Sequence, residues 1–169
     1  PGDRIGLVGA ALSDYRRLDQ LCEQLLGRGH KISLSSLRAD RISPMLLQSL
    51  AASDIRTVTL APEAGTERLR RVIRKDLDEE QILAAVDLIG RFQFRQIKLY
   101  FMIGLPTEQP EDLQGVVDLT RKAAALFCRR GSGRELRVSI NTFVPKPWTP
   151  FQWAGMATER EIRAKRRSV

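Results

Sequence analysis

The sequence contains few residues that bind metal ions or form disulfides. Among 169 residues there are two cysteines, Cys22 and Cys128, and one histidine, His30. The cysteines lie far apart and no CxxC or CxxxCxxC spacing occurs, which excludes a disulfide framework and a site with closely spaced cysteine ligands within this chain. We expect both cysteines to be reduced core residues of helices in a cytoplasmic protein. His30 lies in a Gly-Arg-Gly-His turn and is not expected to be a ligand.

Long apolar runs are also missing. No stretch approaches the roughly 20 apolar residues that cross a bilayer, so we expect no membrane partner. Residues 1–12 do not show the basic and then apolar pattern of a signal peptide, and the sequence does not begin with Met, which favours a fragment or a processed product. Hydrophobic residues make up 43% and charged residues 28%, which is ordinary for one globular domain with a sizeable core.

Negative charge is in short supply. Lysine and arginine number 28 against 20 for aspartate and glutamate, which gives a net charge of +8. Such an excess suits phosphate or nucleic-acid partners. The arginines are nevertheless spread over most of the expected helices, and the only dense run is "EREIRAKRRS" at 159–168. We therefore favour a solvated basic surface and keep nucleic acid as the less favoured partner.

Apolar runs with strand character alternate with helical patterns along the chain. The predicted strands are 4–12, 31–37, 57–63, 96–104 and 137–144. Between them, apolar residues recur at helical spacing. Helix starts are marked by the cap signals Ser43-Pro44, Thr66, and Asp78 with Gln81. Strand–helix alternation predicts parallel strands joined by right-handed crossovers.

Each predicted strand has an apolar face and a more polar face. In the strand 57–63, Thr57, Thr59 and Glu63 share one face because alternate residues point to opposite sides. Doubly wound sheets are covered on both faces and have apolar strands throughout. We therefore predict an α/β fold: a partial, open TIM-like barrel of five parallel strands, with outer helices and a polar lumen. A sheet with one solvated face is the alternative.

In barrels the active site lies at the carboxyl ends of the strands. In this sequence those ends are 10–14, 35–38, 63–66, 104–108 and 143–151. The junction Gly104-Leu105-Pro106 stands at one of them. Glycine lets a ligand approach the backbone, and proline fixes a turn, so this junction is a candidate pocket rim.

Five segments at these strand ends resemble a radical S-adenosylmethionine (radical SAM) enzyme. They are "GAALSDY" at 9–15, "SLSSLRAD" at 33–40, "APEAGTERLRRVIRK" at 61–75, "YFMIGLPTEQPEDL" at 100–113 and "NTFVPKPWTPFQW" at 141–153. More narrowly, they resemble uncharacterised iron–sulfur oxidoreductases that often carry a cobalamin-binding domain upstream. The resemblance implies a barrel of six βα units that binds S-adenosylmethionine and a four-iron (4Fe-4S) cluster. Three cysteines of a CxxxCxxC loop hold that cluster, and reductive cleavage of the cofactor gives a 5′-deoxyadenosyl radical.

The sequence departs from this pattern because it has no CxxxCxxC. The resemblance therefore implies that the chain begins just before the family's second strand. Residues 1–153 are then the later five of six units, and residues 154–169 are a linker entering a helix that leaves the domain or is cut short. We expect the full-length parent to be an oxidoreductase and this chain alone to be inactive. The missing N-terminal part of the same protein is an expected partner, and cobalamin stays open as a further cofactor of the parent.

The resemblance assigns cofactor contacts to the first three strand ends. Ser13 and Asp14 lie where many relatives have Gly-Gly-Glu, which meets the amino group of the cofactor methionine. Ser35 and Arg38 are expected at the cofactor carboxylate or ribose, since a guanidinium can bind both oxygens of a carboxylate. A surface loop is the alternative for Arg38. Glu63 is expected at the ribose hydroxyls or the amino group, or else as a structural carboxylate.

Further contacts are assigned to later segments. Gly65 and Thr66 are expected to offer backbone donors at a helix start. Ile103 and Gly104 resemble the segment beside adenine, so a side chain added at Gly104 is expected to weaken cofactor binding unless the turn itself needs glycine. Glu108 is expected to be a solvated loop residue.

Aromatic and basic residues near these segments have weaker assignments. Phe143, Trp148 and Phe151 are expected to wall the lumen, with packing of the loop onto the barrel bottom or a neighbouring domain as the alternative. Arg71 and Arg74 are expected to be solvated.

Other classes of protein remain open. A tRNA-modifying, methylthiotransferase-like radical enzyme suits the basic charge, although no RNA-binding module follows the barrel. A catalytically inert barrel fragment that serves as a scaffold is a second alternative. An ordinary aldolase-like barrel is a third, but Lys98 lies too early in its strand to be its catalytic lysine.

Overall fold

The computed structural model describes residues 4–9 and 12–169, so Ala10 and Ala11 of the predicted first strand lie outside it. The strands are β1 (Arg4–Leu7), β2 (Lys31–Leu34), β3 (Thr57–Glu63), β4 (Gln96–Ile103) and β5 (Glu135–Thr142). The helices are α1 (Leu18–Gly27), α2 (Pro44–Ala52), α3 (Glu67–Val72), α4 (Glu79–Gly90), α5 (Pro110–Cys128) and α6 (Glu159–Ser168). Two short 3-10 helices, η1 (Leu12–Asp14) and η2 (Ala39–Arg41), follow the first two strands.

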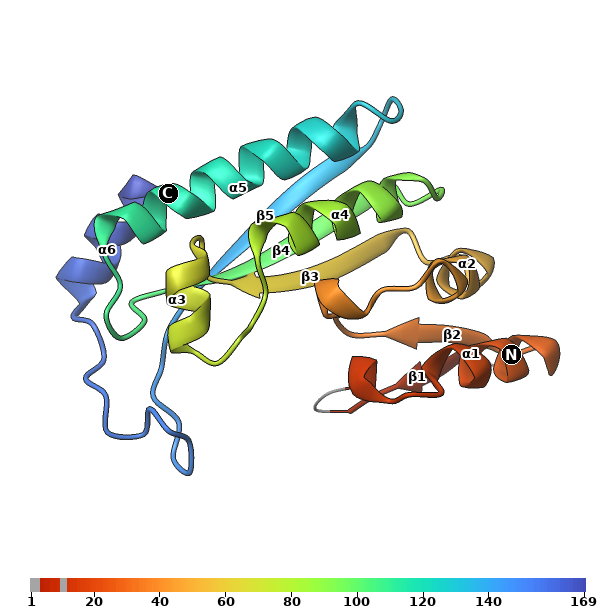
Figure 1. Ribbon diagram of the computed structural model, residues 1–169, viewed down its shortest axis with the longest axis horizontal. Helices are drawn as coiled ribbons and strands as arrows, with labels where there is room; N and C mark the ends of the chain where they lie inside the picture. The colour runs from red at the N-terminus through yellow and green to blue at the C-terminus, as the bar shows by residue number, and fades with distance from the viewer. Residues whose placement is uncertain (1–3, 10–11) are drawn as a thin grey trace.

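All strand pairs are parallel, so the predicted α/β fold is confirmed. The strands form two sheets, β1-β2 and β3-β4-β5, and among the described strands no barrel closes (Figure 1). The five parallel strands therefore fit the predicted partial barrel only loosely, as two sheets. One isolated bridge, Leu37 to Leu60, joins the two sheets, and the Leu37 N–H donates to the Thr59 carbonyl at 2.9 Å. Ser35 and Ser36 are exposed after β2, so the ladder ends there apart from this bridge.

The predicted alternation of faces is confirmed in β3 and β4, but not in β5, whose residues are all exposed or half-buried. In β4 the apolar residues Ile97, Leu99, Phe101 and Ile103 are all 0% exposed, and the intervening residues are half-buried. Helices α4 and α5 lie over the apolar face (Figure 1). Each side chain buried in this way contributes about 1.5–3 kcal/mol, so this layer is the main core.

The predicted helix starts are confirmed by their caps. The Ser43 hydroxyl accepts a hydrogen bond from the Leu46 N–H at 3.0 Å, and Pro44 stands in the first turn of α2. Asp78 and Gln81 form the reciprocal capping box of α4. These local signals position α4 directly before β4, which carries part of the site.

Two expectations about the chain are wrong. Helix α6 does not leave the domain, because Ile162 is buried in a cluster with Ile103 and Leu113. Cys22 is buried as expected, but Cys128 is exposed at the end of α5 and is not a core residue. None of the helices in the described part of the chain has an apolar stretch of the length needed to cross a membrane.

Candidate functional site

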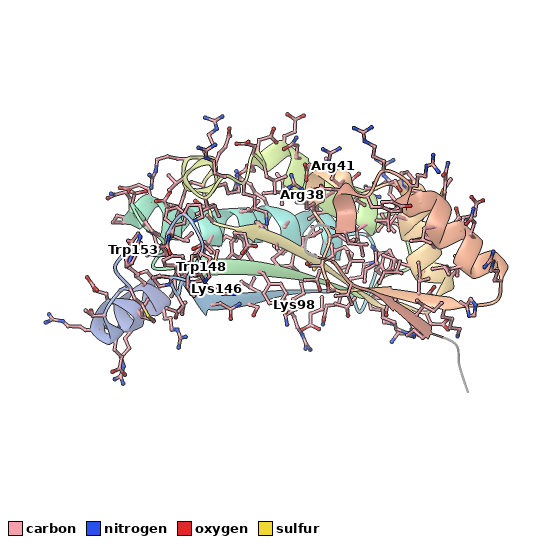
Figure 2. The ribbon with its side chains drawn as sticks, turned by 90° about the horizontal axis from the view of Figure 1, so that it is seen from below. Arg38, Arg41, Lys98, Lys146, Trp148 and Trp153 are labelled. Carbon is pink, nitrogen blue, oxygen red and sulfur yellow. The ribbon has the colours of Figure 1, made fainter. Side chains whose placement is uncertain are left out.

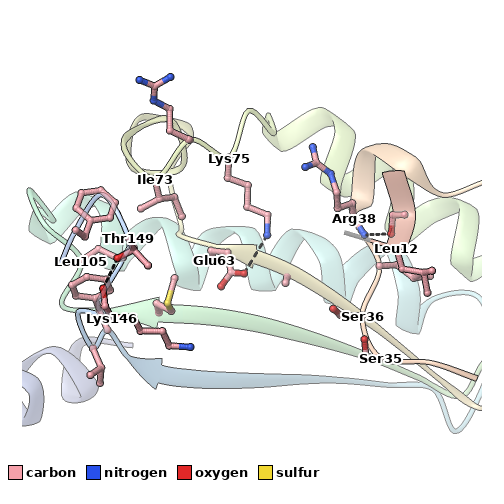
Figure 3. Close-up of a pocket in the computed structure, with 18 of the residues that line it drawn as sticks. Leu12, Ser35, Ser36, Arg38, Glu63, Ile73, Lys75, Leu105, Lys146 and Thr149 are labelled. Atoms are coloured by element: carbon pink, nitrogen blue, oxygen red, sulfur yellow. Dashed lines mark hydrogen bonds and ion pairs between the residues drawn. The ribbon is translucent and has the colours of Figure 1, made fainter. Parts of the chain in front are cut away.

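A cavity of about 760 Å³ opens at the carboxyl ends of the strands. It lies between the two sheets, under the turn that follows α3 and beside the loop that follows β5 (Figure 3). Its volume falls within the range of small-molecule sites. Because parallel strands all point the same way, their ends bring segments that are distant in sequence to this one cavity.

Four of the predicted cofactor contacts line the cavity: Ser13, Ser35, Arg38 and Glu63. Ser13 and Arg38 are directly joined, since the Arg38 N–H donates to the Ser13 hydroxyl at 3.3 Å. Asp14 is not among the lining residues, but its carboxylate lies 3.8 Å from Arg38 Nε. The fold therefore brings together predicted residues from η1, from the segment after β2 and from the end of β3.

Arg38 is held in place by Asp40. Its Nε and Nη2 donate to the two carboxylate oxygens of Asp40 at 3.1 and 2.9 Å. This hydrogen bond raises the pKa of Arg38. Burial alone would raise the pKa of Asp40, but the hydrogen bonds and charge of Arg38 hold that pKa below its usual value. The ion pair with Asp40 fixes the Arg38 guanidinium at the polar end of the cavity. The Arg38 side chain keeps 39% of its surface exposed.

Glu63 has an uncommon backbone conformation at the end of β3. Its φ is +69°, in the left-handed region that bulky residues rarely adopt, and the register of β3 with β4 shifts between Leu60 and Glu63. The Glu63 carboxylate pairs with Lys75 Nζ at 3.2 Å, and both side chains are largely buried. Such strain costs about 1–3 kcal/mol and is concentrated at functional sites. Lys75 follows α3 in the chain and was missed because no local pattern marks it.

Arg70 is a second residue that the sequence did not reveal. It is 1% exposed, and its guanidinium donates to the carbonyls of Leu77 (2.6 Å), Ala64 (2.9 Å) and Gly65 (3.3 Å). Burial lowers the pKa of Arg70, but arginine keeps its charge in proteins. Arg70 thus ties both ends of the segment around α3 together, and that segment carries Lys75 into the cavity.

Gly65 and Thr66 lie outside the cavity, in a separate hollow between α3 and α5. A Cβ at Gly65 would lie 2.2 Å from the Asp112 carbonyl oxygen, so this position needs glycine because α5 packs against it. The Thr66 hydroxyl accepts from the Leu69 N–H and also hydrogen-bonds Asp112. The structure therefore gives both residues a packing and capping role, and their contact with a cofactor stays a prediction.

Ile103 and Gly104 do not line the cavity either. Ile103 is buried, and Gly104 has a φ of +81° with Ile162 and Ala157 where a Cβ would lie. The Gly104 N–H donates to both carboxylate oxygens of Glu108, at 2.9 and 3.1 Å. The Glu108 side chain is only 2% exposed and also pairs with Lys165 of α6, so its prediction as a solvated residue is wrong.

The aromatic residues after β5 divide into two groups. Phe143 and Phe151 line the cavity as expected and meet edge to face, with ring centroids 6.0 Å apart. Trp148 is 92% exposed and does not wall the lumen, so that expectation is wrong. Arg71 and Arg74 are both exposed as expected, and Arg74 also contributes to the lining of the cavity.

The two ends of the cavity differ in polarity (Figure 3). Its polar end is lined by Ser13, Ser35, Ser36 and Arg38. Its opposite end is lined by the apolar residues Ile73, Leu105, Phe143 and Phe151, and Lys146 and Thr149 also lie there beside Leu105 (Figure 3). Glu63 and Lys75 lie between the two ends (Figure 3). The arrangement suits an elongated ligand with a charged group at one end and an apolar or aromatic group at the other.

The described residues do not fit an iron–sulfur cluster. Across residues 4–9 and 12–169, no group of three or more histidine, cysteine or acidic side chains is placed to hold a metal ion. Cys22 is buried in α1, and burial raises its pKa to about 11, which disfavours the thiolate that metals require. Cys128 ends α5 and is exposed. A cluster therefore has no ligand set among these residues.

Comparison with known families gives the class of the protein. Residues 2–120 match the model of the Radical SAM superfamily. The chain belongs to the radical SAM superfamily. Membership in this radical SAM group sets aside the aldolase-like barrel as an interpretation.

Two relatives show how far the radical SAM likeness extends. An uncharacterized protein of Methanocaldococcus jannaschii is 39% identical over 150 residues, which cover 89% of this chain and 32% of that protein. The solved structure of coproporphyrinogen III oxidase (HemN) from Escherichia coli, described as a radical SAM enzyme, has a TM-score of 0.60 at 17% identity. The match covers 99% of this chain and 35% of the HemN chain. At this sequence identity the likeness shows the fold alone. The radical SAM chain thus spans about a third of the length of each relative.

Proposed function

We propose that this chain forms the S-adenosylmethionine-binding part of a radical SAM oxidoreductase located in the cytoplasm. The single observation that carries the proposal is the polarity of the cavity at the strand ends. S-adenosylmethionine has a charged amino-acid group, a central ribose with two hydroxyls, and an adenine ring. The cavity offers Arg38 and serine hydroxyls at one end, the Glu63 carboxylate paired with Lys75 in the middle, and apolar residues around Leu105 beside Lys146 at the other end, in the same order (Figure 3).

Each part of the cofactor has candidate partners in this chain. Arg38, with Ser13 and Asp14 beside it, suits the methionine carboxylate and amino group. The Glu63 carboxylate suits the ribose hydroxyls, because an ionised carboxylate accepts hydrogen bonds from both. Phe143 and Leu105 suit the adenine ring, which stacks on apolar and aromatic surfaces.

The chemistry of the family needs a further component. In radical SAM enzymes the bound cofactor is the source of a 5′-deoxyadenosyl radical that abstracts hydrogen from a substrate. Cys22 and Cys128 do not fit the cluster that this chemistry uses. We therefore propose that the cluster ligands come from other residues of the parent protein, with cobalamin as an additional cofactor still to be tested there.

Calorimetric titration of the chain with S-adenosylmethionine tests the proposal. Arg38→Met is expected to weaken binding about tenfold or more, since a hydrogen bond to a charged group contributes about 1.5–3 kcal/mol. Arg38→Lys is expected to weaken it less, and Glu63→Gln should also reduce affinity. Arg41→Met is the matched control, because Arg41 neighbours Asp40 but does not line the cavity. Absence of binding by the wild-type chain, or equal affinities of the Arg38→Met and Arg41→Met variants, contradicts the proposal. Absence of binding would leave the inert scaffold as the better interpretation.

A tRNA-modifying, methylthiotransferase-like enzyme is the second candidate. One observation favours it: Trp148 and Trp153 are 92% and 90% exposed in the loop whose Lys146 lines the cavity. Figure 2 shows Lys146 near Trp148 on this loop. Exposed aromatic rings next to a cation suit the unpaired bases of an RNA loop. This candidate expects a Trp148→Ala, Trp153→Ala double variant to lose affinity for a single-stranded RNA while it retains S-adenosylmethionine binding.

A further inference from the structure

One face of the three-stranded sheet is not covered by any helix in the described part of the chain (Figure 2). The register pairs Thr59 with Lys98, and Lys98 with Arg137, so these three residues form one row across β3, β4 and β5. In β4, Lys98 alternates with Ile97 and Leu99, which are buried under α4 and α5. The row therefore lies on the opposite, open face, and Figure 2 shows Lys98 on the side away from these helices.

Lys98 differs from the other lysines of the chain. Of six lysines in the sequence, four form ion pairs: Lys31 with Asp54, Lys75 with Glu63, Lys122 with Glu79, and Lys165 with Glu108. Lys146 has no carboxylate partner in the described part of the chain but is exposed. Lys98 is half-buried and, among the described residues, has neither an ion pair nor a hydrogen bond. Its ammonium instead lies 4.7 Å from the centroid of the Tyr100 ring.

This placement leaves a positive charge without a counter-ion on a partly desolvated surface. Burial of a charge is costly unless an opposite charge or hydrogen-bond acceptors compensate it. The neighbouring Arg137 adds a second cation, although it is paired with Glu135 at 2.8 Å. Hydroxyls of Thr59 and of Ser139, the register partner of Tyr100, stand on the same face. The surface thus offers cations and hydroxyl donors, which together suit an oxyanion.

The open face is continuous with the cavity. Met102 lies on the same side of β4 as Lys98 and Tyr100 and also lines the cavity. Residues along a strand rise about 3.3 Å each, so Lys98 lies roughly 13 Å from Met102 along β4. The Lys98 ammonium and the cavity rim, where the proposed cofactor would lie, are therefore on the same face of the sheet.

We propose that the substrate of the parent enzyme is a small organic anion whose phosphate or carboxylate binds Lys98 and Arg137. This inference rests on the proposed function, since it places the substrate beside the proposed cofactor cavity. Tyr100 and Met102 would contact the part of the substrate nearer to the cavity. The two oxyanions share the same recognition chemistry, and probes of each kind distinguish them.

The test uses inorganic phosphate and acetate as probes, with binding followed by the NMR signals of the chain. Lys98→Met is expected to weaken the binding of the preferred probe about fivefold, the upper range for one partly exposed ion pair. Lys98→Arg should retain most of the affinity. Lys122→Met is the matched control, because it removes one positive charge from the helix side of the chain. Arg137→Gln should weaken binding to a smaller extent.

The outcomes separate this inference from the proposed function. Loss of probe affinity in Lys98→Met but not in Lys122→Met supports the anion site. Equal probe affinity of the wild type and Lys98→Met overturns the anion site. An equal loss of affinity in Lys98→Met and Lys122→Met also overturns it, because that result depends only on the overall charge of the chain. S-adenosylmethionine affinity is measured in the same variants and should be unchanged, since neither Lys98 nor Lys122 lines the cavity. If the chain binds no S-adenosylmethionine, the proposed function fails whatever the phosphate titration shows.

Discussion

Two residues at strand ends have a positive φ for different reasons. Gly104 has a φ of +81°, which favours glycine, and an added Cβ would make a tight contact with Ile162 of α6 at 3.0 Å. Glu63 has a φ of +69° although it carries a side chain, and that side chain points to Lys75 in the cavity. The sequence shows that a glycine follows the strand, but it does not show why glycine is required at that position. Here the reason depends on Ile162, which is far along the chain.

Gly104→Ala is expected to destabilise the fold by about 2 kcal/mol without changing cofactor affinity. A left-handed conformation costs a non-glycine residue about 1 kcal/mol, and the new methyl group would also lie 3.0 Å from Ile162 Cδ1. Urea unfolding measures the free energy of unfolding. Gly133→Ala is the control, since its φ is +75° but nothing lies within 4 Å of the added Cβ. If the two variants lose equal stability, the contact with α6 has no energetic role.

At the scale of elements, the local signals were the predictable part. Helix starts at Ser43 and Asp78 depend on residues within one turn, and alternation within β4 depends only on the strand itself. The position of Arg70 could not be predicted in this way. Its three acceptors are carbonyls on both sides of α3, and only the folded loop brings them together. A buried arginine and a solvated one have the same helical spacing in the sequence.

The stability of the packing between α3 and α5 depends on the carboxylate of Asp112, so it also depends on pH. Asp112 is 2% exposed, and it is hydrogen-bonded by Thr66, by the Gln109 N–H at 2.7 Å and by Arg68. Burial alone would raise the pKa of Asp112, but these donors lower it below its usual value. The stabilisation is therefore present above the pKa of an unfolded aspartate, about 4, and is lost as pH falls through the lower folded pKa.

Asp112→Asn is expected to lower the free energy of unfolding at pH 7 by about 1–3 kcal/mol, because it removes a charged acceptor from a buried site. The variant should also lose less stability than wild type between pH 5 and pH 2. Thermal unfolding across this range measures both effects. Glu111→Gln, in the same first turn of α5 but exposed, should differ little from wild type. A variant with the same acid dependence as wild type would show that Asp112 does not control the junction.

At the scale of the whole molecule, the sequence predicted the layers better than the continuity of the sheet. The polar and apolar faces of each strand indicated outer helices and a polar lumen, and β3 and β4 each have one buried face and one more polar, half-buried face. The break between β2 and β3 was not foreseen. It depends on where Leu37 meets Leu60, a contact that no local pattern encodes. The cavity lies at this break, so the most functional region was also the least predictable.

The cysteine content leads to a prediction for the chain as a whole. After anaerobic treatment with ferrous iron and sulfide, the 169-residue chain is expected to retain little iron and to show no thiolate charge-transfer absorption. Cys22 is buried with its pKa raised to about 11, and Cys128 lies apart from it at the end of α5. A variant lacking both cysteines should give the same low background. Stoichiometric iron that this variant loses would contradict the expectation.

The most direct test of the central claim is to map S-adenosylmethionine onto the isotopically labelled chain by NMR. The account predicts that saturating cofactor shifts backbone signals around Ser13 and Arg38, at Glu63, and around Phe143, which together line the cavity. Signals of Gln114 and Asp118 of α5, which line the separate hollow, should remain unchanged. Shifts confined to that hollow, or no shifts at saturating concentration, would contradict the assignment of the cavity as the cofactor site.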